Sequence, residues 1–117
     1  MTFKSDHPFE KRQKEASDIL KKHPNRVPVI CEKNEKSNIA SIDKKKFLVP
    51  NDLTTGQFLY VIRKRMKMAP SEALFLMTEK GCLPSTSSTL NDIYIKNKSD
   101  DGFLYFTYTG ENTFGHS

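Results

Sequence analysis

Histidine and cysteine, the side chains that most often carry catalysis, are few in this sequence and stand apart from one another. His7 and His23 lie at or near the ends of a predicted helix, and His116 lies in the last residues; none has a serine or cysteine beside it in the setting of a nucleophile. The motifs HExxH, GxxxxGK(S/T) and GxGxxG, typical of zinc hydrolases, P-loop proteins and dinucleotide-binding proteins, do not occur. We therefore expect surface histidines, no metal or cofactor, and a protein that is not an enzyme.

The two cysteines and a pair of aspartates also favour a non-catalytic interpretation. Cys31 and Cys82 each lie in an apolar run without a CxxC or Cys/His spacing, which predicts two reduced, buried side chains. Asp100 and Asp101 are adjacent in sequence, and we expect their carboxylates to splay apart in a solvated turn.

Length and composition predict one globular domain. The chain has 117 residues, of which 36% are hydrophobic and 28% charged. No stretch approaches the roughly 18 apolar residues of a membrane span, and the first residues lack the apolar core of a signal peptide. We expect a cytosolic protein.

The net charge of +5 is concentrated toward the start of the chain. Residues 1–46 hold 12 Lys and Arg against 7 Asp and Glu, whereas residues 79–117 hold 3 against 5. Such a basic face could attract nucleic acid, anionic lipid or an acidic peptide, and it could equally be a solvated surface.

The first predicted elements are helical. Residues 9–23 lack glycine and proline and are rich in helix formers. Pro24 ends this helix, Pro8 fits its first turn, and Ser5 or Asp6 could cap a shorter turn before it.

Two strands follow and suggest a hairpin. Residues 26–33 alternate like a strand, in which Pro28 favours an edge position or a strand start. Residues 44–50 form a second strand, with Phe47 and Val49 on one side and Leu48 on the other.

A helix, a strand, a short helix and a final strand complete the pattern. Thr54 and Gln57 form a capping box that starts the central helix. Residues 73–78 are nearly all apolar and predict a strand covered on both faces. Ser88 or Thr89 starts the short helix, and residues 103–109 form the last strand. The predicted buried face of the central helix consists of Phe58, Val61, Ile62 and Met66, and that of the short helix of Leu90, Ile93 and Tyr94.

This order predicts an α+β fold of the β-grasp type: a mixed four-stranded sheet over a central helix, with the last strand inside the sheet. A ferredoxin-like α+β sandwich is the alternative. We expect a helical N-terminal extension at 1–24, the β-grasp core at 25–110 and a flexible tail at 111–117.

The basic run Lys44–Lys46 precedes the second strand, whose exposed neighbours Leu48, Pro50 and Leu53 are apolar. An extended acidic and hydrophobic peptide could add a strand at such an edge, with main-chain bonds for affinity and side-chain pockets for selectivity. The lysines could equally protect an open edge from aggregation. The residues alone favour neither interpretation.

The tail contains a second candidate site. Phe114 and Gly115 are followed by only His116 and Ser117 in the sequence. A glycine carboxylate has no Cβ beside it, so it can pass through a narrow enzyme channel and be attacked with little hindrance.

Several long motifs carry a family resemblance. HPFEKR (7–12), NRVPVICEK (25–33), DKKKFLVPNDLTTGQF (43–58), IRKRM (62–66) and the FG pair at 114–115 resemble the ubiquitin-like autophagy modifiers, the family of the GABA-receptor-associated protein and microtubule light chain three. The likeness runs from about residue 4 to residue 115.

The resemblance implies a lipid-conjugated modifier. A processing cysteine protease would remove His116 and Ser117, and activating and conjugating enzymes would transfer the Gly115 carboxylate to the amino group of phosphatidylethanolamine. Two acyl chains are sufficient for stable anchoring. The protein would then recruit cargo receptors to the autophagosome membrane.

The resemblance also implies two pockets for receptor motifs of the form aromatic-x-x-aliphatic. The first maps to Glu15, Ile19, Pro28, Ile30, Lys46, Leu48 and Phe103, and the second to Phe47, Val49, Pro50, Leu53, Phe58, Val61 and Ile62. Acidic residues beside the motif would meet Arg26, Lys44 and Lys45, and Arg65 matches a position used in partner and protease recognition. This favours the functional interpretation of the edge strand.

Two other functions compete with the conjugated modifier. A non-conjugated adaptor of the same fold would bind peptides without processing at Gly115. A basic nucleic-acid-binding domain would need aromatic residues interleaved with the basic patch, whereas here the aromatics mostly alternate into the presumed core, so we expect no nucleic-acid partner. The sequence also differs from the family pattern at His23, Asn25 and Gly102. The turn at 79–82 is one residue longer than in the family, so the resemblance does not predict the shape of this turn.

Overall fold

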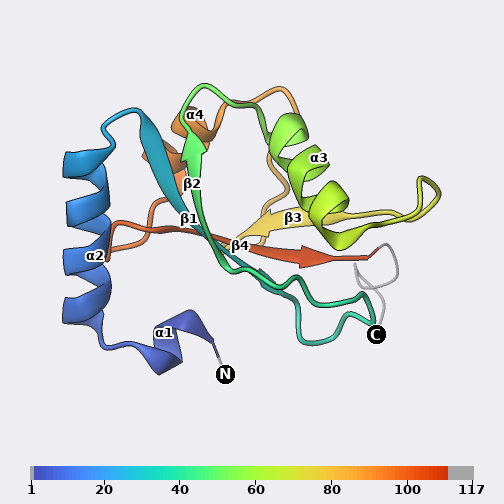
Figure 1. The fold of residues 1–117 in the computed structure, drawn as a ribbon, viewed down its shortest axis with the longest axis horizontal. Coiled ribbons are helices and arrows are strands. Elements are labelled where there is room, and N and C mark those ends of the chain that lie inside the picture. Colours follow the sequence, from blue (N-terminus) through green and yellow to red (C-terminus); the bar gives the residue numbers. More distant parts are fainter. Residues whose placement is uncertain (1, 111–117) are drawn as a thin grey trace.

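The computed structural model describes residues 2–110 and has three layers, with a sheet between two pairs of helices (Figure 1). Within this range the elements are α1 (Phe3–Asp6), α2 (Phe9–Lys22), β1 (Arg26–Lys33), β2 (Lys46–Pro50), α3 (Thr55–Met66), β3 (Phe75–Thr78), α4 (Leu90–Asn97) and β4 (Leu104–Thr109). Their order agrees with the sequence prediction. No helix of residues 2–110 is long and apolar enough to cross a bilayer.

The sheet has the strand order β2-β1-β4-β3. The two inner strands, β1 and β4, run parallel, and each outer strand is antiparallel to its neighbour. The last strand therefore lies inside a mixed sheet, which confirms the predicted β-grasp over the ferredoxin-like alternative.

Pro28 lies in an inner strand, so the predicted edge position of this strand is wrong. The hydrogen bonds of β1 to the two neighbouring strands explain why proline fits there. The Cys31 N–H donates to Lys45 O at 2.8 Å and the Asn51 N–H to Asn25 O at 2.9 Å, so the hydrogen-bonded pairs with β2 fall on odd residues of β1. Pairing with β4 begins only at Val29. The missing N–H of Pro28 is therefore not needed by either neighbour.

The two faces of the sheet are buried by different helices. One face forms the main core with α3 and α4, where Phe58 packs edge-on against Phe47 with ring centroids 5.5 Å apart. The other face is covered by α1 and α2 and forms a second cluster: Phe3, Ala16, Ile30, Phe103 and Tyr105. The N-terminal helices thus form a layer that covers this face of the sheet.

The helix caps agree with the sequence in two of four helices. The Thr54–Gln57 capping box starts α3, and Thr89 caps α4. Thr2, rather than Ser5 or Asp6, caps α1, because its hydroxyl accepts the Ser5 N–H at 3.1 Å. Pro8 is the N-cap of α2, whereas we predicted it within the first turn of the helix.

Two predicted burial patterns are wrong. β3 is an edge strand in which Leu76 and Thr78 are buried while Phe75 and Met77 are half-buried, so only one face is fully covered. The buried stripe of α3 runs through Thr55, Phe58 and Ile62. Val61 lies beside that stripe and is 45% exposed.

Candidate functional site

β2 forms a free edge of the sheet, as the basic run before it suggested. Because Phe47 and Val49 face β1 with their main-chain groups, those of Lys46 and Leu48 point outward. The Leu48 carbonyl accepts a hydrogen bond from Arg26 Nη1 at 3.0 Å. The strand therefore presents the outward groups of Lys46 and the Leu48 N–H to an extended peptide, and the Leu48 carbonyl can join them when the exposed Arg26 side chain releases it.

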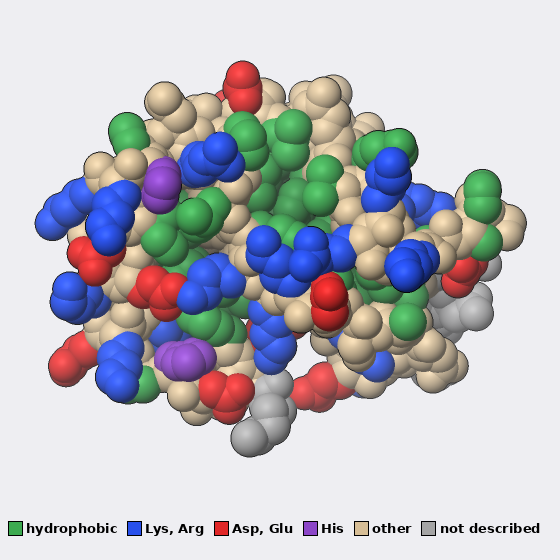
Figure 2. All heavy atoms as spheres, viewed as in Figure 1, with side chains coloured by type: hydrophobic (Ala, Val, Ile, Leu, Met, Phe, Trp, Pro, Cys, Tyr) green, Lys and Arg blue, Asp and Glu red, His purple; other side chains and the backbone are tan. Residues whose placement is uncertain are grey.

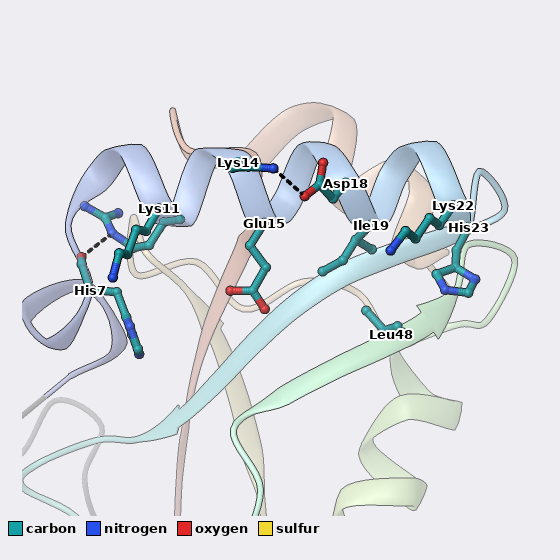
Figure 3. A pocket seen from close by; sticks show the side chains of 10 residues that line it. His7, Lys11, Lys14, Glu15, Asp18, Ile19, Lys22, His23 and Leu48 are labelled. Carbon is teal, nitrogen blue, oxygen red and sulfur yellow. Dashed lines mark hydrogen bonds and ion pairs between the residues drawn. The ribbon is translucent and has the colours of Figure 1, made fainter.

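A hollow of about 500 Å³ lies between α2 and β2. Glu15 and Ile19 project from α2 toward the strands, and Leu48 points from β2 toward α2 (Figure 3). The apolar centre is rimmed mainly by cations. The lining residues are His7, Lys11, Arg12, Lys14, Glu15, Asp18, Ile19, Lys22, His23 and Leu48. We call this hollow the α2–β2 groove.

The residues predicted for the first pocket separate into an exposed set and a buried set. Glu15, Ile19, Lys46 and Leu48 are half-buried at the groove, where Lys46 pairs with Glu15 across it. Pro28, Ile30 and Phe103 are buried in the sheet. Ile30 and Phe103 belong to the second cluster, against which Ile19 packs.

The residues predicted for the second pocket do not all share one face. Phe47 and Val49 face the main core from β2, and Leu53 packs against that core from the loop before α3. Phe58, Val61 and Ile62 belong to α3, and Pro50 is the exposed last residue of β2. Phe47, Val49, Phe58 and Ile62 are at most 6% exposed and belong to the main core, so their first role is structural. The accessible members are Pro50, Leu53 and Val61. Figure 2 shows hydrophobic side chains gathered over β2 and toward α3, with Lys and Arg side chains below them.

The cations beside β2 already have partners within the chain. Lys45 pairs with Glu32 at 3.1 Å, and Arg65 Nε donates to Asp43 at 2.9 Å. Lys44 Nζ lies 5.1 Å from the centroid of the Phe47 ring. Because these groups are largely at the surface, the contacts are weak and acidic groups of a ligand can replace them.

A buried ionic network, which the sequence did not predict, lies behind the groove. Asp101, predicted to be solvated, is 1% exposed. Its carboxylate accepts hydrogen bonds from Arg12 Nη1 at 2.6 Å, from the Tyr105 hydroxyl at 2.6 Å and from the Phe103 N–H at 2.9 Å. Burial, and then the bond to Asp101, raise the pKa of Tyr105 far above its ordinary value, so the hydroxyl stays a donor. Arg12 and Asp101 are 89 residues apart, and no local pattern links them.

The cysteines and histidines show no catalytic arrangement among the described residues. Cys31 is buried, as predicted, and burial followed by the nearby Glu32 raises its pKa to about 12. Cys82 is exposed, contrary to prediction, because it ends a surface turn in which Gly81 has φ +84°. His7 and His23 are exposed at the groove.

The second candidate site lies outside the described residues. It comprises Phe114, Gly115 and His116, so the structure does not test the predicted processing site.

A mixed β-grasp sheet over a central helix defines the ubiquitin-like class of proteins, and comparisons identify the family. Residues 11–115 match the family model described as "Autophagy protein Atg8 ubiquitin like". The chain belongs to this family of autophagy proteins.

Its relatives are similar over nearly their whole length. The chain is 60% identical to "Autophagy-related protein 8" of Coccidioides immitis over 114 residues, covering 97% of each, and 58% identical to the protein of the same name from Gibberella zeae over 115 residues, covering 98% and 97%. The crystal structure of Trypanosoma brucei ATG8 superposes with a TM-score of 0.90 at 47% identity, covering 98% of both chains. This chain is therefore a ubiquitin-like protein of autophagy.

Proposed function

We propose that this ubiquitin-like autophagy protein is conjugated through the carboxylate of Gly115 to phosphatidylethanolamine and then recruits cargo receptors to the autophagosome membrane. A processing cysteine protease hydrolyses the bond after Gly115 and releases His116 and Ser117. An activating enzyme then adenylates the Gly115 carboxylate with ATP and passes it as a thioester to a conjugating enzyme, and the lipid amine displaces that enzyme's thiol to form the amide. The protein itself catalyses none of these steps. It is cytoplasmic before conjugation and membrane-anchored afterwards, since the acquired lipid has two acyl chains.

The observation that supports the conjugation site most directly is the extent of the family match, which runs from residue 11 to Gly115. A glycine with a free carboxylate suits this chemistry as the acyl donor, because it places no side chain beside the carbon that the amine attacks.

Intact mass spectrometry of the protein from the membrane fraction of starved cells tests the conjugation. We expect a species that ends at Gly115 and carries the mass of phosphatidylethanolamine. Gly115→Ala should abolish it. Gly110→Ala is the matched control, because an added Cβ there meets only Ser37 Oγ at 3.9 Å. An intact chain still carrying His116 and Ser117, in cells that process a known relative, would favour a non-conjugated adaptor.

Receptor binding is proposed for the edge of β2 and the apolar regions on either side of it. A receptor segment pairs with the outward main-chain groups of Lys46 and Leu48. Its aromatic anchor enters the α2–β2 groove, and its aliphatic anchor contacts the accessible Pro50, Leu53 and Val61. Acidic residues beside the receptor motif contact Arg26, Lys44 and Lys45. Arg65 takes part in partner and protease recognition. Calorimetric titration with a motif peptide and with its doubly alanine-substituted form tests this assignment.

A further inference from the structure

The Arg12–Asp101–Tyr105 network joins the wall of the α2–β2 groove to the sheet beneath it. Arg12 belongs to α2 and also lines the groove, whereas Tyr105 lies in β4. The side chain of Asp101 is fully buried and that of Arg12 is 11% exposed. A charge pair so well shielded from water, with two further hydrogen bonds to the same carboxylate, holds its partners in one geometry.

A close backbone approach strengthens the same connection. Gly102 has φ +94°, and a Cβ built on it would lie 3.0 Å from the Cβ of Ala16 in α2. Its carbonyl accepts the hydroxyl of Tyr94 at 2.6 Å, which ties the turn to α4 as well. The helix can therefore approach the 101–102 turn this closely only because glycine occupies position 102.

The network reaches the groove by two routes. Through Arg12 it fixes α2, which carries Glu15 and Ile19 to the groove. Through Phe103 and Tyr105 it fixes the second cluster on which Ile19 packs. The opposite wall, Leu48, belongs to β2 and has no direct bond to Asp101. The width of the groove thus depends on the position of α2, and the bond from Arg12 to Asp101 is one of the contacts that hold this helix.

We propose that Asp101 is a positioning residue that, with Arg12, sets the width of the α2–β2 groove and thereby selects which aromatic anchor the protein accepts. This inference rests on the proposed binding of aromatic-x-x-aliphatic motifs. It concerns the aromatic anchor alone, because Leu53 and Val61, which we propose to contact the aliphatic anchor, lie with α3 and the main core on the other side of the sheet from α2.

Two peptide series test the proposal. One varies only the aromatic anchor (Trp, Phe or Tyr), and the other varies only the aliphatic anchor (Leu, Ile or Val). Binding is measured for the full chain and for Asp101→Asn by the fluorescence anisotropy of a labelled peptide. The chain contains no tryptophan, so the intrinsic fluorescence of the Trp-anchored peptide provides an independent signal.

Asp101→Asn should change the ratios of Kd within the aromatic series by roughly three- to tenfold and leave those of the aliphatic series within about twofold. Mere destabilisation lowers the fraction of competent protein and raises every apparent Kd by the same factor, so it cannot change a ratio. A uniform loss in both series, or unchanged ratios, would overturn the proposal.

Two further variants keep the test decisive. Tyr105→Phe removes one donor to Asp101 without leaving a buried charge unpaired, and it should shift the aromatic series in the same direction if Asp101→Asn fails to fold. Asp92→Asn is the matched control: it makes the same exchange at an exposed carboxylate in the first turn of α4, on the other side of the sheet from α2. It should change neither series. If the unmodified protein bound no motif peptide, the proposed function itself would fail.

Discussion

Phe47 and Leu48 are neighbours in sequence but act on opposite faces of β2. Phe47 is 6% exposed and packs on Phe58 in the main core, while Leu48 is half-buried at the α2–β2 groove. The alternation of a strand predicted this separation. The resemblance implied that both residues line pockets. Only Leu48, however, can be substituted without damage to the core.

Leu48→Ala should therefore weaken the binding of a motif peptide by tenfold or more, since buried anchors dominate such interfaces. It should change the free energy of unfolding by less than about 1 kcal/mol. Phe47→Ala should cost about 3–5 kcal/mol of stability, as for other buried aromatics. Urea unfolding and calorimetric titration separate the two effects. Unchanged peptide binding by folded Leu48→Ala would show that the groove is not the receptor site.

The two cysteines should differ sharply in reactivity. With a pKa of about 12, Cys31 has about one thiolate in ten thousand at pH 8, and it is also buried. Cys82 is exposed and should react alone with an alkylating reagent in the native protein. Mass spectrometry after a timed pulse measures this. Cys82→Ser should leave the native chain unlabelled, and rapid labelling of that variant would contradict the burial of Cys31.

At the scale of elements, the sequence predicted best where a local rule acts alone. The capping box at Thr54, the cap at Thr89 and the alternation in β2 depend on residues within a few positions, and all are confirmed. The burial of Val61 and of β3 was predicted wrongly because it depends on which neighbour covers each face. Periodicity finds an apolar stripe, but only the packed fold decides how wide the covered part is.

The end of α3 offers a test of local backbone strain. Lys67 caps the helix in the left-handed conformation, with φ 55°, where glycine is favoured. Lys67→Gly should therefore raise the free energy of unfolding by up to about 1 kcal/mol. Lys64→Gly, the same exchange at an exposed position inside the helix, should lower it by about 1 kcal/mol. Chemical denaturation measures both, and equal signs for the two variants would contradict the assigned cap.

At the scale of the whole molecule, long-range contacts account for what the sequence could not predict. The second cluster joins Phe3 to Phe103, and the buried network joins Arg12 to Asp101. Neither leaves a periodic or spaced signal. The candidate groove was located only because the family motifs brought α2 and β2 together, whereas periodicity alone predicted an N-terminal extension.

Removal of residues 1–24 tests whether these helices are a layer of the fold. The shortened chain would expose Ile30, Phe103 and Tyr105, all of them at most 6% exposed in the full chain, and would leave Asp101 without Arg12. We expect a loss of more than about 3 kcal/mol in the free energy of unfolding, because a large apolar patch and a buried charge lose their partners. Binding of a hydrophobic dye should rise accordingly.

A shorter deletion provides the matched comparison and divides the contributions of the two helices. Without residues 1–7 the chain loses Phe3 and the Lys4–Glu79 pair but keeps Arg12, Ala16 and Ile19 in place. The exposed pair contributes little, so the cost should be that of one buried aromatic, and the network at Asp101 should remain. Peptide binding should then survive the shorter deletion and disappear with the longer one. If both shortened chains unfolded at the same urea concentration as the full protein, the helices would be an appendage after all, and the groove would lose its structural wall.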